Sequence, residues 1–154
     1  MLLLMFRTGE TRYAIDTKRV VEVVPRVDFR SLPHAPAYLI GLLGYRGKVV
    51  PVIDFSLLVG RSPCREVLSS RVILTEFTAM DGRAQLLGLL AENVSRVYNI
   101  SHEQFMTTAM ALEEAPYLGA VLNREEGLVQ LVVADKLLSV RMQKALFGAT
   151  EEPA

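Results

Sequence analysis

The chain has 154 residues, 51% of them hydrophobic and 22% charged, and its 17 basic residues balance its 17 acidic ones. This is the composition of a folded globular protein with one domain or two very small ones, and the balanced charge provides no long-range field to attract nucleic acid or an anionic membrane surface. Cys64 is the single cysteine, which excludes an internal disulfide and is typical of a reducing compartment.

The N-terminal residues predict a hairpin followed by a capped turn. Residues 2–6 and 12–15 are strand-like runs on either side of the turn-forming TGET. We expect MLLLMF to be the first strand, because it is too short for a signal-peptide core and is followed by Arg7 instead of a cleavage site. Asp16 is placed to cap one helical turn. No apolar run approaches the roughly 20 residues of a membrane helix, so we expect a cytoplasmic protein.

The next strand places one carboxylate among four valines and ends at a proline. By strict alternation Val20, Glu22 and Val24 share one face, and Val21 and Val23 share the other. The face with the carboxylate is either the seam between two packed units or an exposed apolar patch, and the sequence leaves both interpretations open.

The stretch GLLGYRGKVVPVID at 41–54 predicts strand, tight turn, strand. β-Branched residues dominate the outgoing arm, where a half-buried pleated backbone favours them. Pro51 cannot donate to a ladder, so this arm is expected at a sheet edge or a bulge. At the tip, Arg46 follows Tyr45 and precedes a glycine. It is either a solvated turn residue or a preorganised guanidinium that pairs with a partner.

Three other candidate sites fail. Five residues separate Gly41 from Gly47 where a Walker motif has four, and a valine follows the lysine. His34 and His102 stand far apart, without a cysteine or carboxylate at ligand spacing. Cys64 lies between two arginines that would lower a thiol pKa, but no base is placed to activate it. We therefore expect no catalysis, no metal and no cofactor.

The rest of the chain continues in short elements. We expect a proline-rich loop at 25–36, a short helical turn at 35–39 and a polar linker at 61–70. A strand at 71–79, a turn at Asp81-Gly82 and one long strand or two strands joined at a bend at 84–100 should follow. Loops or a short helix at 101–115 and a second strand-turn-strand at 117–135 precede a helix at 134–150, in which Leu137, Leu138, Met142, Leu146 and Phe147 have helical spacing.

The second half of the chain repeats the first. APAYL at 35–39 matches APYL at 115–118, and VVPVIDFSLL at 49–58 matches VQLVVADKLL at 129–138. The first copy has GYRG at its hairpin tip, whereas the second has NREEG. Two copies of one small β-rich unit are therefore expected, each supporting the other's core, as antiparallel barrels or a sandwich. A groove between them is a natural binding site.

Three motifs together resemble the CheW family of chemotaxis coupling proteins, and the resemblance covers nearly the whole chain. They are RYAIDTKRVVEVV, LPHAPAYLIGLLGYRGKVVPVIDF and LLGLLAENVSRV. The resemblance implies an all-β fold of two packed five-stranded β-barrel subdomains with short helices and a C-terminal helix. It implies one CheW-like domain over residues 1–154, made of two pseudo-repeated subdomains with their seam near 61–70.

The same resemblance implies a non-catalytic scaffold. Such proteins link the cytoplasmic tips of methyl-accepting chemoreceptors to the regulatory domain of a CheA-type histidine kinase, and are recruited to membrane-associated receptor arrays without direct membrane contact. The positions carried over are Val20, Glu22 and Arg46; their neighbours Val24 and Tyr45 complete the expected partner-binding set. A helix-in-groove contact would draw mainly on apolar burial.

Two departures from the family pattern accompany these matches. Gly44 stands where the family commonly has asparagine, and Ala91-Glu92 stands where Val-Asp is frequent. They favour a coupling protein of an alternative chemosensory pathway, of a surface-sensing or second-messenger type. Two other functions stay open: a barrel that binds a small ligand in the groove, and an adaptor that binds the receptor but not the kinase.

Overall fold

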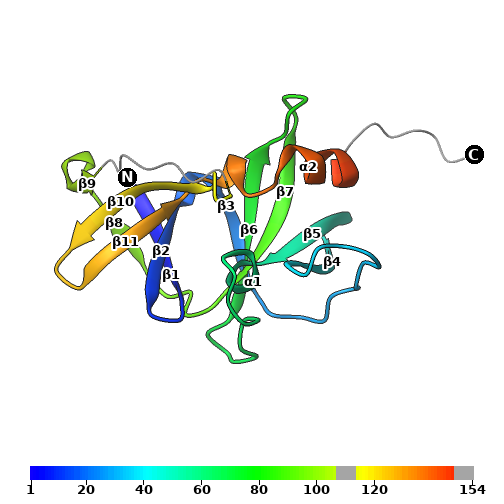
Figure 1. Cartoon of the computed structure of the whole chain (residues 1–154), viewed down its shortest axis with the longest axis horizontal. Helices are drawn as coiled ribbons and strands as arrows, with labels where there is room; N and C mark the ends of the chain where they lie inside the picture. Colours follow the sequence, from blue (N-terminus) through cyan, green and yellow to red (C-terminus); the bar gives the residue numbers. More distant parts are fainter. Residues whose placement is uncertain (107–113, 148–154) are drawn as a thin grey trace, which may run out of the picture.

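The computed structural model describes residues 1–106 and 114–147, with the side chain of His102 left out. Two curved β-sheets lie side by side and share one core (Figure 1). Sheet A contains, in spatial order, β8 (Val97–Asn99), β1 (Leu2–Thr8), β2 (Thr11–Asp16), β11 (Gly127–Val132), β10 (Leu118–Arg124) and β9 (Phe105–Met106). Sheet B contains β3 (Val20–Pro25), β6 (Arg71–Thr78), β7 (Ala84–Ala91), β5 (Lys48–Asp54) and β4 (Leu39–Tyr45). The expected mainly β architecture is confirmed, but sheet A has six strands instead of the expected five, because β9 adds to its edge beside β10.

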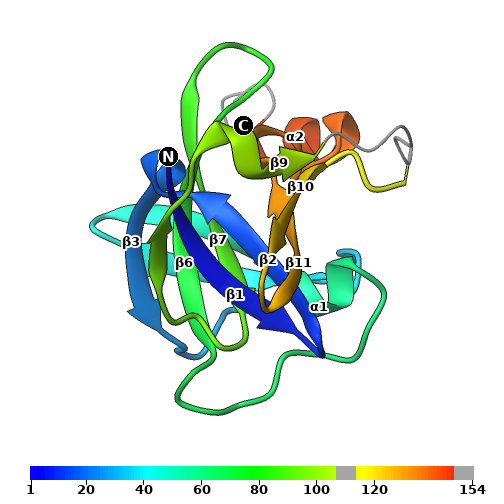
Figure 2. The same cartoon turned by 90° about the vertical axis from the view of Figure 1, so that its left-hand side faces the viewer.

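Among the described residues, helices are few and short. They are α1 (Phe55–Leu58), α2 (Val140–Phe147) and 3-10 turns at Thr17–Arg19, His102–Gln104 and Ala134–Lys136. Figure 1 shows α2 beside the β6–β7 hairpin of sheet B, where the rings of Phe77 and Phe147 meet with centroids 5.6 Å apart. Figure 2 presents sheet A, with β9 beside β10 at its edge.

The two sheets are not the two halves of the chain. If β1, β2, β3, β4 and β5 are matched in turn with β6, β7, β8, β10 and β11, the two sheets have the same strand order. The hairpin β1–β2 of the first half, however, lies in sheet A with β8, β10 and β11, and the hairpin β6–β7 of the second half lies in sheet B with β3, β4 and β5. Strands from both sides of 61–70 therefore contribute to each sheet. The division into two pseudo-repeated subdomains with a seam near 61–70 stays a proposal.

This exchange corrects the expectation of purely antiparallel sheets. β2 pairs with β11 in parallel in sheet A, and β5 pairs with β7 in parallel in sheet B. A parallel pair needs a long connection between its strands. The exchange of hairpins provides one, because other strands lie between the two partners in the sequence.

Buried side chains form three clusters. One lies within sheet A around Leu3 and Leu122, and a second lies within sheet B around Val52 and Leu74. The largest joins the two sheets and includes Phe6 and Ile73. At its centre Phe55 is fully buried. Its ring centroid lies 5.1, 4.7 and 6.2 Å from those of Phe6, Tyr13 and Tyr117 respectively.

Several local predictions are confirmed. Asp16 caps a helical turn, because its carboxylate accepts a hydrogen bond from the Lys18 backbone N–H at 3.0 Å. The Asp81-Gly82 pair forms the β6–β7 turn, with Gly82 at φ +82°. Segment 84–100 forms two strands joined at a bend, where Asn93 takes φ +49°. Part of the expected loop at 101–115, and the end of the helix expected at 134–150, lie outside the described residues.

Three local predictions are wrong. The helix expected at 134–150 is split, because Ser139 caps a new helix by accepting a hydrogen bond from the Met142 N–H at 3.2 Å. The 35–39 segment, expected as a helical turn, has no helix. It contains a single turn in which the Leu39 N–H donates to the Pro36 carbonyl oxygen at 3.0 Å. Pro51 was expected at a sheet edge or a bulge, but it lies in β5, an inner strand of sheet B. The missing N–H of this proline is tolerated because the pairing of β5 with β7 begins one residue later, at Val52.

Candidate functional site

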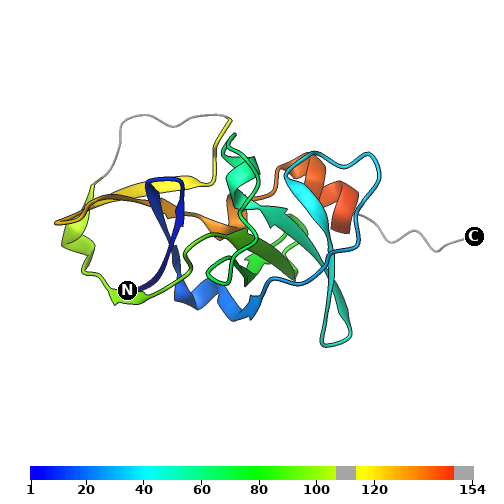
Figure 3. The same cartoon turned by 90° about the horizontal axis from the view of Figure 1, so that it is seen from below.

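The tip of the β4–β5 hairpin is a two-residue turn. Tyr45 pairs with Lys48, and both intervening residues take positive φ, +46° at Arg46 and +78° at Gly47. This is the type I′ geometry, whose twist matches that of the flanking strands. Figure 3 shows the tip projecting from the body of the molecule.

Arginine is an unfavourable residue for the first position of such a turn. A left-handed backbone costs an L residue roughly 1–2 kcal/mol, and asparagine, aspartate or glycine is the usual choice. Backbone strain of this kind gathers at functional sites. The identity of Arg46 therefore points to a use for its guanidinium that the turn alone does not require.

The structure brings the two predicted charges together. The guanidinium of Arg46 lies 3.5 Å from the Glu22 carboxylate, with the side chains 75% and 41% exposed. The pair joins β3 to the β4–β5 hairpin, although β3 and β4 are opposite edges of sheet B. We call the place where these two edges approach each other, at Glu22 and Arg46, the mouth of sheet B. A pair this exposed contributes at most about 1 kcal/mol to stability. The pair holds the guanidinium beside β3 while both side chains stay exposed to solvent.

Tyr45 supports this charged pair from the apolar side. The Arg46 guanidinium lies 5.3 Å from the centre of the Tyr45 ring, within cation–π range. Both Tyr45 and Val24 are half-buried and pack against the sheet B cluster. Three of the five predicted residues, Glu22, Tyr45 and Arg46, therefore meet, and Val24 packs against the same sheet B cluster as Tyr45.

Val20 does not share this face. A β-bulge between Val20 and Glu22 shifts the register of β3 against β6, so strict alternation fails. Val20 packs with Val23 against the cluster between the sheets, whereas Val24 packs within sheet B. The expectation that Val20, Glu22 and Val24 lie on one face is therefore wrong at Val20.

A hollow beside the hairpin was missed by sequence reasoning. Its volume is about 340 Å³, and its lining includes Lys48, Val49, Leu86 and Phe147. Val49 is 70% exposed. Its outward position has no signal in the sequence, because the neighbouring positions of β5 are also apolar and alternation cannot be recognised.

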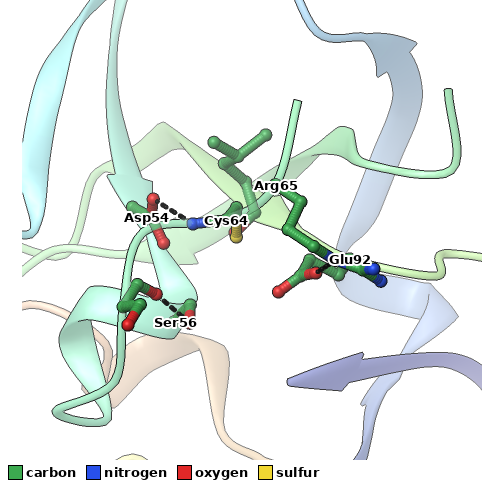
Figure 4. A network of polar contacts seen from close by, with 7 residues as sticks. Asp54, Ser56, Cys64, Arg65 and Glu92 are labelled. Atoms are coloured by element: carbon green, nitrogen blue, oxygen red, sulfur yellow. Dashed lines mark hydrogen bonds and ion pairs between the residues drawn. The ribbon is translucent and has the colours of Figure 1, made fainter. Parts of the chain in front are cut away.

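The 61–70 segment is anchored by a partly buried set of polar contacts (Figure 4). The Asp54 carboxylate accepts hydrogen bonds from the backbone N–H groups of Leu57 at 3.1 Å and Cys64 at 3.0 Å. Arg65 lies 2.8 Å from the carboxylate of Glu92, so the glutamate that departs from the family pattern has a defined partner. The segment is therefore held against sheet B and is more than a loose connection.

Cys64 is unsuited to nucleophilic chemistry. Its side chain is buried and its sulfur lies 3.5 Å from the Leu90 carbonyl oxygen. Burial, reinforced by the negative charge of Asp54, raises the pKa of the Cys64 thiol to about 12. The expectation that flanking arginines would lower this pKa is therefore wrong, because burial of the thiol and the nearby Asp54 carboxylate dominate.

We predict that Cys64 reacts slowly with a thiol reagent such as iodoacetamide in the folded protein at pH 8, and rapidly in denaturant. The raised pKa keeps the thiol protonated when folded, so this group's contribution to stability is complete below pH 9 and declines as the pH rises from about 9 to 12. Alkylation followed by mass spectrometry measures both rates. Equal rates in the folded and denatured protein would contradict the prediction.

Other chemistry finds little support in the described residues. Within 1–106 and 114–147 no group of three or more His, Cys, Asp or Glu side chains is placed to hold a metal ion. His34 is exposed and takes φ +62° in a turn. Among the same residues, no helix has the length and apolar character needed to cross a membrane.

Comparison with known proteins gives a consistent picture. The family model of the CheW-like domain matches residues 2–142. The chain is 25% identical to a probable chemotaxis protein CheW of Rhizobium etli, over 99% of this chain and 90% of that protein. It is 30% identical to the chemotaxis protein CheW of Treponema pallidum, over 86% of this chain and 78% of that protein.

A solved structure shows the same fold. The crystal structure of the scaffolding protein TtCheW from Thermoanaerobacter tengcongensis superposes with a TM-score of 0.77 at 22% identity, covering 96% of this chain and 90% of that one. The paired sheets and the matched family model agree over almost the full length of the chain. The chain therefore belongs to the CheW-like domain family, whose members act as coupling and scaffold proteins in chemotaxis signalling.

Proposed function

We propose that this protein is a non-catalytic cytoplasmic scaffold that links the tip of a methyl-accepting chemoreceptor to the regulatory domain of a CheA-type histidine kinase. Family membership supports the coupling role. The observation that carries the site is the Arg46 guanidinium, displayed on a strained two-residue turn and positioned by Glu22. A rigid hairpin lowers the entropy lost when a partner binds, since the contact residue is already in place.

The apolar surface beside the charge supplies the binding energy in this proposal. Tyr45 and Val24 are half-buried and Val49 is largely exposed. Covering such side chains stabilises a complex by roughly 1.5–3 kcal/mol for each one fully buried. The charged pair then selects the partner and its register more than it adds affinity.

Separate titrations of the purified protein with a receptor-tip fragment and with the kinase regulatory domain test the proposal. Saturable binding to both is expected. Binding to neither would overturn it. Binding to the receptor alone would favour the adaptor function, and stabilisation by a metabolite without either protein contact would favour a small-ligand-binding barrel. The assignment to an alternative, surface-sensing or second-messenger pathway stays a prediction.

We predict that Arg46→Glu weakens binding to one partner by about 1 to 3 kcal/mol, as the loss of an interface hot spot does. The melting temperature should change little, because the ion pair with Glu22 is exposed. Calorimetric titration measures the affinity. Arg141→Glu is the matched control, since it makes the same charge change on an exposed position of α2.

A charge exchange separates direct contact from positioning. Glu22→Arg combined with Arg46→Glu keeps an ion pair across the mouth of sheet B but moves the guanidinium to β3. If Arg46 contacts the partner directly, the double variant stays as weak as Arg46→Glu. Full recovery of affinity would show that only the pairing matters, and full affinity of the single variant would remove Arg46 from the site.

A further inference from the structure

Sheet A carries a second hollow, distinct from the mouth of sheet B, with an unusual concentration of arginines. Its volume is about 190 Å³. The lining comes from β1, β2, the bend after β7, β8, the end of β10 and the turn that follows it; it includes Arg7, Arg12, Tyr98, Arg124 and Glu126. Three guanidinium groups thus face one carboxylate side chain.

Two of the arginines are direct cross-strand neighbours. Arg7 of β1 pairs in register with Arg12 of β2. Residues directly opposite each other lie on the same face of a sheet, and like charges in that arrangement destabilise the hairpin. Arg124, from β10, adds a third positive charge to the same hollow. Folding gathers these charges at a cost that an anion in the hollow would offset.

The arginines keep most of their donors free. Arg12 donates one hydrogen bond to the Glu126 carbonyl oxygen at 2.9 Å, and the Nε of Arg124 donates to the Glu126 carboxylate at 3.1 Å. Arg7 has no side-chain hydrogen bond or ion pair with any residue in the described ranges. Since each guanidinium has five N–H donors, the greater part of this donor capacity has no acceptor within the part of the chain that the structure describes.

The hollow is also partly preorganised. The Arg124 guanidinium lies 4.4 Å from the centre of the Tyr98 ring, and its side chain is only 19% exposed. The hydrogen bond from Arg124, with further attraction from Arg12, lowers the pKa of the Glu126 carboxyl. This carboxylate therefore stays charged near neutral pH and compensates one of the three positive charges, leaving two.

From this placement we infer that Arg7, Arg12 and Arg124 form a binding site for a small oxyanion, such as a phosphate or a short dicarboxylate. The forked guanidinium matches the oxygens of both groups. The volume is below the roughly 300 Å³ at which pockets begin to enclose drug-sized ligands, so a nucleotide is excluded from full entry. This inference does not depend on the proposed coupling function.

Titration with inorganic phosphate and with succinate, at constant ionic strength set by sodium chloride, tests the site. Backbone amide NMR shifts should saturate, with the largest changes at the β1–β2 and β10–β11 turns. Tighter binding of phosphate would identify a phosphoryl group as the ligand chemistry, and tighter binding of succinate a carboxylate. Shifts that rise linearly with either anion, or that chloride reproduces, would overturn the inference.

Three variants give effects of different sign. Arg7→Gln should weaken anion binding about tenfold or more while the melting temperature stays equal or rises, because a repulsive neighbour of Arg12 is removed. Glu126→Gln should strengthen binding, because it removes the competing carboxylate. Arg141→Gln, on α2 and outside the hollow, should leave the affinity unchanged. Equal affinity in all four proteins would overturn the site.

Discussion

Replacing Phe55 with alanine is expected to lower the free energy of unfolding by about 3 to 5 kcal/mol, the usual loss for a fully buried phenylalanine. Phe55 is 0% exposed and touches aromatic rings from three other segments. Phe6 and Tyr13 belong to sheet A, whereas Phe55 starts the helix that follows β5 of sheet B. The cavity would therefore open in the core that joins the two sheets.

Urea unfolding followed by circular dichroism measures this loss. Phe147→Ala is the matched control: its ring also meets an aromatic neighbour, but the side chain is only half-buried at the end of α2. We expect the control to lose less than half as much. A loss below about 2 kcal/mol for Phe55→Ala would show that the surrounding rings collapse into the space.

Replacing Asp54 with alanine is expected to lower the free energy of unfolding by about 3 kcal/mol, since each hydrogen bond to a charged group contributes roughly 1.5–3 kcal/mol. The Asp54 side chain caps α1 through the Leu57 N–H and holds the 61–70 segment through the Cys64 N–H. Asp54 is 2% exposed, so water cannot readily replace the lost acceptor. Two backbone donors would remain unsatisfied.

The same unfolding measurement tests this expectation, with two companion variants. Asp54→Asn should lose less, because the amide keeps one acceptor oxygen for one of the two donors. Asp16→Ala, which removes an exposed cap, should lose only about 1 kcal/mol. The alanine variant should also expose Cys64 to alkylation, since its backbone anchor is lost. If Cys64 stays protected and stability is unchanged, the network in Figure 4 does not hold the segment.

Much of the candidate site is readable from the sequence because it depends on local rules. Glycines around Arg46 and β-branched residues after it predict the hairpin and its displayed charge, and the structure has that hairpin. Asp16 and the Asp81-Gly82 pair follow local capping and turn preferences in the same way. In each case the deciding interactions span only a few residues.

The β3 register could not be read in this way. Alternation places Val20 beside Glu22, but a bulge separates them because pairing with β6, some fifty positions later in the chain, sets the register. The approach of Glu22 to Arg46 is also a tertiary event, because it needs the two edges of sheet B to curve toward each other. The three-arginine hollow likewise combines strands from both ends of the chain.

By itself, the sequence determined the β-rich class, the internal repeat, the hairpin with Arg46 at its tip and the family. Only the tertiary structure decided that each half of the chain contributes strands to both sheets, that Glu22 pairs with Arg46, and that Arg7, Arg12 and Arg124 share a hollow. The physical reason is one of range. Backbone preferences and side-chain periodicity act over a few residues, whereas strand pairing and the meeting of charges depend on packing between segments far apart in the chain.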